Sequence, residues 1–137
     1  MERIVLDTNC LIQILSKKSS THNVWEAIIA DDVVLCVTTE ILFEYTEILT
    51  QITSREVADN VVLAITKRPN TVLVTNYYHW NIIKSDPDDN KFVDCAVTAN
   101  ARYVVSNDAH FNVLRTIDFP KLDLINLKEY SDTLRRS

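Results

Sequence analysis

Residues 3–9 read RIVLDTN, and residues 103–108 read YVVSND. Each stretch is a short apolar run rich in β-branched residues, typical of a buried strand, followed directly by polar residues that include an aspartate. Other such runs alternate with helical patterns, so the chain is predicted to be an α/β protein whose parallel sheet is covered on both faces. Functional residues of such sheets lie beyond the carboxyl ends of the strands. We therefore expect Asp7 and Asp108 to lie at one edge of the sheet.

The remaining elements are predicted outward from these two strands. Further strands are expected at 33–37, 71–74 and 122–125. Helices are expected over 9–17, after Thr21, over 39–52, from Ser54 to before Pro69, over 90–101 and after Asp108, with an amphipathic segment at the C-terminal end. Thr21, Thr38 or Thr39, and Ser54 are the expected helix caps. No repeat or linker divides the chain, so residues 1–137 are expected to form one domain.

Composition excludes several functions. The 137 residues include no glycine. Walker phosphate loops, Rossmann fingerprints, nucleophile elbows and EF-hands need glycine for close backbone approach or positive φ, so they are ruled out. Cys10, Cys36 and Cys95 stand singly among apolar residues and are interpreted as buried thiols of a reducing compartment. We find neither a signal peptide nor a run of about 18 apolar residues, and therefore expect a cytoplasmic protein without membrane contact.

Two further acids lie at the margins of apolar helix faces. At about 100° per residue, Glu44 falls about 100° from the centre of the apolar arc of the 39–52 helix. Asp94 takes the equivalent place in the 90–101 helix. An acid at such a margin can be held rigidly while its carboxylate reaches a cleft. Taken singly, however, Asp7 or Asp108 is more typical of a helix cap, and Asp94 is equally typical of a first-turn acid.

Asp7, Glu44, Asp94 and Asp108 in one cleft would repel one another unless a cation compensated them. Oxygen ligands favour Mg²⁺ or Mn²⁺, and the three histidines, His22, His79 and His110, are scattered and interpreted as structural or exposed. A site made of carboxylates suits phosphodiester hydrolysis. The formal charge of −5 does not argue against nucleic acid, because the rest of the chain is nearly neutral once these acids are set aside.

Basic residues supply the candidate phosphate contacts. They are Lys17, Lys18, Lys67, Arg68, Lys91, Arg115 and Lys121, each of which, taken singly, is more typical of a solvated surface. The DPDDN run at 86–90 has calcium-loop spacing. Lys91 stands where that loop needs glycine, and Val97 stands where it needs a bidentate glutamate, so a calcium loop is rejected.

At these residues the chain resembles the PIN-domain family of metal-dependent ribonucleases, and in particular the toxins of bacterial toxin–antitoxin systems. The matching motifs are Asp7-Thr8-Asn9 after the first strand, Thr39 with Glu44, the block DPDDNKFVDCA at 86–96, and Ser106-Asn107-Asp108. The resemblance implies a three-layer α/β/α sandwich with a central parallel sheet. It also implies an endoribonuclease that uses one or two Mg²⁺ or Mn²⁺ ions, an RNA substrate, a cognate antitoxin protein and a homodimer.

The resemblance also assigns roles. It makes Asp7, Glu44, Asp94 and Asp108 the metal-binding, catalytic acids, and Thr8, Asn9 and Ser106 the polar groups that orient them. Asp89, one helical turn before Asp94, matches a further family acid and is a weaker candidate. The family usually has glycine at position 107 and another acid at position 110, where this chain has Asn107 and His110. Asparagine tolerates positive φ, so we expect a left-handed residue at 107.

Two alternatives to a single-strand-directed ribonuclease stay open. One is a catalytically weak module that binds RNA or an antitoxin peptide, which the departures at 107 and 110 favour. The other is a phosphatase of the haloacid-dehalogenase type, which also begins with an acid after its first strand. That class needs a second aspartate at position 9, where Asn9 stands.

Overall fold

The fold is built on a five-stranded parallel sheet with strand order β3-β2-β1-β4-β5. The computed structural model describes residues 1–136. The strands are β1 (Arg3–Leu6), β2 (Val34–Val37), β3 (Val72–Leu73), β4 (Tyr103–Val105) and β5 (Asp123–Ile125). The chain fills the sheet from β1 to β3 in one direction and then returns to β4 and β5 in the other. The reversal places a topological switch between β1 and β4, where open α/β sheets bind ligands.

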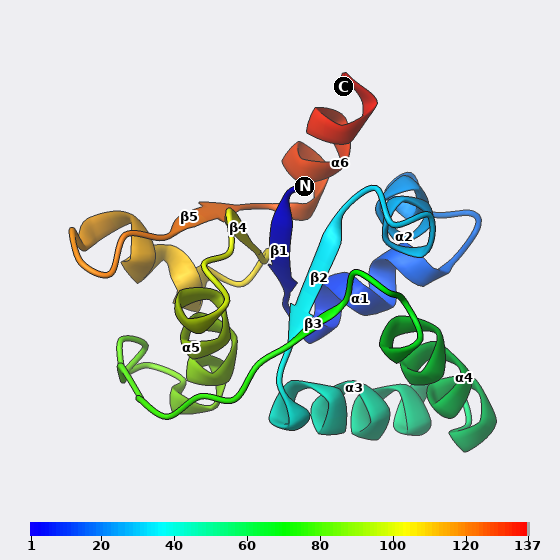
Figure 1. Cartoon of the computed structure of the whole chain (residues 1–137), viewed down its shortest axis with the longest axis horizontal. Helices are drawn as coiled ribbons and strands as arrows, with labels where there is room; N and C mark the ends of the chain where they lie inside the picture. Colours follow the sequence, from blue (N-terminus) through cyan, green and yellow to red (C-terminus); the bar gives the residue numbers. More distant parts are fainter. Residues whose placement is uncertain (137) are drawn as a thin grey trace.

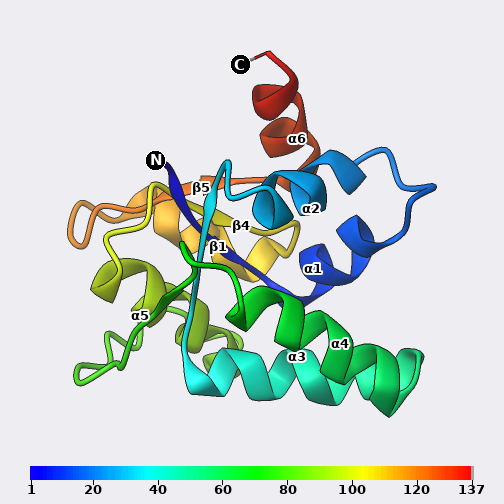
Figure 2. The ribbon, with the colours of Figure 1, turned by 45° about the vertical axis from the view of Figure 1, so that its right-hand side comes forward.

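Helices cover both faces of the sheet. They are α1 (Thr8–Leu15), α2 (His22–Ile29), α3 (Thr39–Ile52), α4 (Arg55–Thr66), α5 (Asn90–Thr98) and α6 (Leu127–Arg135), with 3₁₀ turns η1 (Pro87–Asp89) and η2 (Ala109–Thr116). Because parallel crossovers are right-handed, the reversal of direction puts α1 to α4 on one face and α5 with η2 on the other, as Figure 1 shows. Figure 2 shows α6 beside α2. The predicted three-layer α/β fold is confirmed.

The core explains how α3 reaches the end of β1. Ile4, Val5 and Leu6 are fully buried, as the continuous apolar run predicts. Tyr45 of α3 is buried too, and its hydroxyl donates to the Leu6 carbonyl oxygen at 2.6 Å. This bond fixes α3 against the carboxyl end of β1. Glu44, the neighbour of Tyr45, is thereby held near Asp7.

Two of the three expected helix caps are confirmed. Thr38 accepts a hydrogen bond from the Ile41 amide, and Ser54 accepts one from the Val57 amide. Thr21 precedes α2 but makes no cap bond, because its hydroxyl pairs with that of Ser19. The expectation for Thr21 was therefore wrong.

Two helices end without glycine on left-handed residues. Asp31 follows α2 with φ 59°, and Asn100 follows α5 with φ 53°. The turn at Asn100 ends α5 at Thr98, earlier than the expected 101, and lets the Ala101 amide donate to the Ala96 carbonyl. Aspartate and asparagine replace glycine here because their short polar side chains tolerate this conformation.

Asn107 does not adopt the expected left-handed conformation. The described residues with positive φ are Asp31, Asn81 and Asn100. Asn107 instead uses its side chain: Oδ1 accepts a hydrogen bond from the Leu127 amide at 3.0 Å, at the start of α6. This bond explains an asparagine at 107 without any need for positive φ.

The cysteines and the helices agree with the composition. Cys10, Cys36 and Cys95 are free, buried thiols, and burial raises the pKa of Cys10 to about 12 and that of Cys36 to about 11. Within residues 1–136, every helix is too short or too polar to cross a membrane.

Candidate metal centre

Asp7 lies where β1 ends and α1 begins. Its carboxylate is almost fully buried and accepts hydrogen bonds from the Asn9 amide at 3.3 Å and the Ser106 hydroxyl at 2.7 Å. The Ser106 oxygen in turn accepts from the Asp108 amide at 3.0 Å. These bonds tie the carboxyl ends of β1 and β4 together. Ser106 therefore has the orienting contact that the sequence predicts, whereas Asn9 supplies its backbone amide while its side chain is exposed.

The electrostatic environment of Asp7 is unfavourable to its charge. Burial raises the pKa of Asp7, and the negative charges of Asp108 and Glu44 raise it further, against the hydrogen bonds from Ser106 and Asn9, which lower it. Two expected acids, Asp108 and Glu44, therefore lie near enough to Asp7 to repel it. The structure brings together three of the four acids that the sequence analysis selected.

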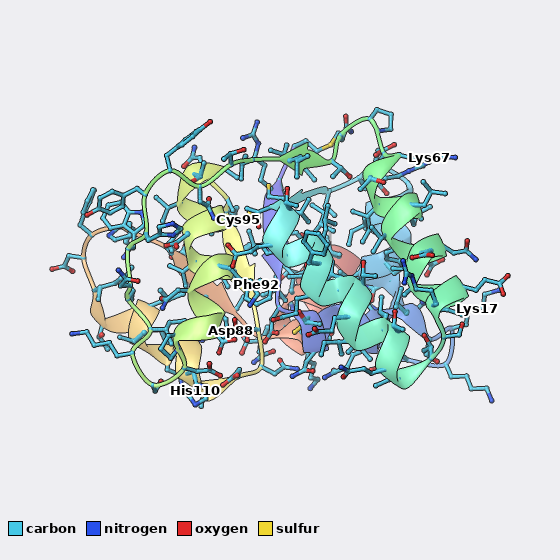
Figure 3. All side chains as sticks on the ribbon, turned by 90° about the horizontal axis from the view of Figure 1, so that it is seen from below. Lys17, Lys67, Asp88, Phe92, Cys95 and His110 are labelled. Atoms are coloured by element: carbon cyan, nitrogen blue, oxygen red, sulfur yellow. The ribbon has the colours of Figure 1, made fainter. Side chains whose placement is uncertain are left out.

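On the other side of Asp108, three carboxylates surround His110. The His110 Nδ1 atom lies 3.2 Å from Asp108 Oδ1, 3.6 Å from Asp89 Oδ2 and 3.7 Å from Asp86 Oδ2. Ligand atoms of Asp86, Asp89 and His110 all lie within 4.8 Å of one another, a spacing that one metal ion can span. Figure 3 looks onto this edge of the sheet and labels Asp88 left of centre and His110 at the lower left.

Asp89 carries the least compensated charge of the group. Its Oδ2 atom is buried and has no hydrogen-bond partner. Burial, followed by the charges of Asp86, Asp108 and Asp7, raises the pKa of Asp89 to about 6, although His110 lowers it in part. A buried carboxylate oxygen without a partner is costly unless a cation or proton supplies one. Asp89, the weaker candidate from the sequence, directly precedes α5 and belongs to the acidic cluster.

Glu44 has its charge compensated by the chain itself. The Thr8 hydroxyl donates to Oε2, and the Lys91 ammonium donates to Oε1 at 2.8 Å. Lys91 also contacts Asp88 through its carbonyl oxygen at 2.8 Å and its carboxylate at 3.0 Å. Burial alone would lower the pKa of Lys91, but the bonds to Glu44 and Asp88 outweigh it and raise that pKa. Lys91 is thus a buried ion-pair partner, which corrects its assignment as a surface phosphate contact.

Asp94 faces a different part of the molecule from the other acids. Its buried carboxylate accepts from the Trp80 amide at 3.1 Å and pairs with His79 Nδ1 at 3.2 Å. Both oxygens are thus occupied by the irregular segment that precedes η1. Asn90, one turn earlier on α5, holds the same segment through the Ile83 amide and carbonyl groups at 2.8 and 2.9 Å. Asp94 therefore anchors this segment, and its expected place beside Asp7 is corrected.

The free basic residues lie away from the acids or at their margin. In Figure 3, Lys17 and Lys67 lie at the right of the molecule, away from Asp88 left of centre and His110 at the lower left. Lys18 follows Lys17 and is exposed as well. Arg115 is exposed on η2, the element that begins beside His110. Arg115 is therefore better placed than Lys17 or Lys18 to meet a substrate at the acidic edge.

Asp86 and His110 were missed by the sequence analysis as members of the cluster. The DPDDN run was rejected as a calcium loop, and Asp89 was the one candidate taken from it. The histidines appeared scattered because their partners come from distant positions. The one available signal was the resemblance itself, which places an acid at position 110. His110 occupies that position and faces the same carboxylates.

The donor set fits a hard divalent cation. Asp7, Asp89 and Asp108 offer oxygen atoms, at least one of which has no hydrogen-bond partner, in a cluster where negative charges repel one another. Oxygen donors of this kind select Mg²⁺ or Mn²⁺. The arrangement is therefore suited to holding a metal ion beside a phosphate.

Comparison with known proteins agrees with this geometry. The family model described as PIN domain matches residues 3–110. The chain belongs to the PIN domain family. The match extends from the start of β1 to His110, so it includes all the acids described above. No curated protein sequence matches the chain.

Solved structures share the PIN fold at low sequence identity. VapBC2 from Rickettsia felis, bound to a DNA fragment from its promoter, aligns with a TM-score of 0.63 at 15% identity, over 90% of this chain and 98% of that one. DNA-bound VapBC from Salmonella typhimurium aligns with a TM-score of 0.57 at 16% identity, over 93% and 99%. The PIN domain endonuclease Utp24 aligns with a TM-score of 0.53 at 16% identity, over 90% and 84%. At these identities the likeness establishes the fold.

Proposed function

We propose that this chain is a metal-dependent endoribonuclease that hydrolyses phosphodiester bonds in single-stranded RNA. The observation that carries the proposal is the buried, unpartnered Asp89 Oδ2 atom, set among Asp7, Asp86 and Asp108 at the switch point of a PIN-domain sheet. A cluster of carboxylates that repel one another is suited to a divalent cation and to the anionic substrate that such a cation attracts.

Asp7, Asp89 and Asp108 would hold Mg²⁺ or Mn²⁺, with Asp86 and His110 beside them. The ion, when bound, would lower the pKa of a water molecule and offset the charge of the phosphate. Ser106 holds the Asp7 carboxylate in orientation through its 2.7 Å hydrogen bond, and Thr8 does the same for Glu44. Asp94 contributes indirectly by anchoring the segment that leads to Asp86.

The test is cleavage of a panel of single-stranded RNAs with Mn²⁺ and with excess EDTA, followed by analysis of the product ends. We expect cleavage with Mn²⁺, 5′-phosphate and 3′-hydroxyl products, and none in EDTA. Asp7→Asn should abolish cleavage, whereas Glu47→Gln, at an exposed acid of α3, should not. Wild-type cleavage that continues in EDTA would contradict the metal-dependent reaction.

A catalytically weak binding module is the second candidate. The observation in its favour is that the chain supplies two cationic or proton-bearing groups of its own, Lys91 and His110, to the same acids. Such a module would hold RNA or an antitoxin peptide and use the carboxylates as structure. It predicts no Mn²⁺ binding and no gain in melting temperature when Mn²⁺ is added, the opposite of what the nuclease predicts.

We further propose that the nuclease is the toxin of a toxin–antitoxin pair, inhibited by a cognate antitoxin protein, homodimeric and cytoplasmic. The structural likeness to two VapBC complexes supports the pairing, and three buried free thiols suit a reducing compartment. Growth arrest on expression, relieved by the protein encoded by a neighbouring gene, is the expected outcome. Light scattering of the purified chain tests the dimer.

A further inference from the structure

The Lys91 ammonium is surrounded by oxygen atoms, as a bound metal ion would be. It has three donors, and three oxygens lie within hydrogen-bond distance: Glu44 Oε1 at 2.8 Å, the Asp88 carbonyl at 2.8 Å and Asp88 Oδ1 at 3.0 Å. The side chain is only 6% exposed. Lysine is almost never buried unless it is paired, so the ion pairs with Glu44 and Asp88 are what hold this ammonium inside the protein.

Glu44 has both oxygens occupied by the chain. Thr8 donates to Oε2, and Lys91 donates to Oε1. A metal ion could bind this carboxylate only by displacing Lys91 from it. Asp89, by contrast, has a buried oxygen without a hydrogen-bond partner. The acidic cluster therefore has one end filled by a buried ammonium, and another end where Asp89 Oδ2 accepts no hydrogen bond and the His110 imidazole lies 3.6 Å away.

We propose that Lys91 takes the place of a second metal ion, so that the chain binds one divalent ion, at the Asp89 end of the acidic cluster. The inference rests on the proposed function. Nucleases of the two-metal type place a positive charge on each side of the phosphate. Here a buried lysine, fixed by Glu44 of α3 and Asp88 of η1, supplies the positive charge that a second ion would bring to Glu44 and holds that carboxylate in place. Lys91 is accordingly a positioning residue.

The test is the number of Mn²⁺ ions bound per chain, measured by equilibrium dialysis without RNA. The wild-type protein should bind one ion, and Lys91→Arg should also bind one because the cation is retained. Lys91→Met should bind a second ion, because Glu44 then lacks a cation, and Mn²⁺ should raise its melting temperature more than that of the wild type. Lys84→Met, at an exposed lysine of the preceding segment, is the matched control and should behave as wild type.

Two bound ions in the wild-type protein would overturn this inference while leaving the proposed nuclease intact, whereas no bound ion would overturn both. A single ion in folded Lys91→Met would also overturn the inference. Should Lys91→Met fail to fold, Glu44→Gln decides: retention of the single ion supports a site at the Asp89 end, and its loss contradicts it.

Discussion

The acidic cluster has two ends, one with Glu44 and Lys91 and one with Asp89 and His110, and they are built differently. At the Glu44 end, Thr8 and Lys91 occupy both carboxylate oxygens, and the lysine is buried with them. At the Asp89 end, a buried oxygen has no hydrogen-bond partner, and neighbouring acids raise the pKa of that carboxyl to about 6. Negative charge is therefore compensated by a buried ammonium at one end, whereas at the other end the His110 imidazole lies 3.6 Å from an Asp89 oxygen that accepts no hydrogen bond. An uncompensated buried charge is the better indicator of a ligand site.

The largest expected effect separates the two ends by activity. Asp7→Asn, at the Asp89 end, should lower kcat/KM for RNA by at least about 10²-fold, because it removes the negative charge of a carboxylate proposed to hold the metal ion. The Asn9 amide can still donate to an asparagine oxygen, so α1 should remain capped. Glu44→Gln should lower kcat/KM less. Steady-state cleavage of a fluorescent RNA measures both, and equal losses would show that the two ends do not differ.

The second prediction concerns the pH dependence of stability without metal. Asp89 has a pKa of about 6 in the folded chain against an ordinary value of 3.8. The folded state therefore binds more protons between these values, and the free energy of unfolding should fall as pH rises from 4 through 6. The loss should be at most about 3 kcal/mol, and the raised pKa of Asp7 acts in the same direction.

Urea unfolding in EDTA at several pH values measures this dependence, and Asp89→Asn provides the reference. The variant should be the more stable protein at pH 7, with a smaller fall in stability over the same range. A wild-type chain that gains stability relative to Asp89→Asn as pH rises would contradict the prediction.

The third prediction compares the hydroxyls that serve the two ends. Ser106→Ala removes the 2.7 Å bond to Asp7 and should weaken Mn²⁺ binding about 10- to 100-fold. Thr8→Val removes the hydroxyl that contacts Glu44 and should weaken it less, because Lys91 still holds that carboxylate. Calorimetric titration gives both affinities. A larger loss in Thr8→Val would reverse the assignment of the metal to the Asp89 end.

The smallest effect is expected at Asn107, which lies between Ser106 and Asp108 but contacts α6. Asn107→Gly should lower stability by about 1 kcal/mol, through loss of the bond to the Leu127 amide, and should leave Mn²⁺ affinity unchanged. Chemical unfolding and the Mn²⁺ titration test this pair of expectations. Tighter Mn²⁺ binding with unchanged stability would indicate that this turn favours a left-handed residue after all.

The fold and one pair of acids could be predicted because they depend on local pattern and sheet geometry. The apolar runs at β1 and β4 end in Asp7 and Asp108, and parallel strands bring those ends to one edge. Glu44 followed from its place at the margin of α3's apolar face. Tyr45, buried against β1, is the contact that turns this margin toward Asp7.

The choice between Asp89 and Asp94 could not be made from periodicity. Asp94 lies at the margin of α5, as expected, but that margin faces the segment before η1, whose path has no regular pattern. Asp89 lies in η1 itself, where helical angles do not apply. The ion-pair contacts of Lys91 and His110 could not be predicted for a related reason. Each residue contacts acids from more than one element, and only the folded chain brings those acids together.

Titration calorimetry of Mn²⁺ binding tests the central claim most directly. It is carried out on the wild-type chain, on Asp89→Asn and on Asp94→Asn. The account predicts that Asp89→Asn weakens Mn²⁺ binding by more than the roughly 10- to 100-fold that loss of an outer hydrogen bond costs. Asp94→Asn, which keeps an oxygen for the Trp80 amide, should bind Mn²⁺ nearly as the wild type does. Loss of binding in Asp94→Asn with retention in Asp89→Asn would contradict it.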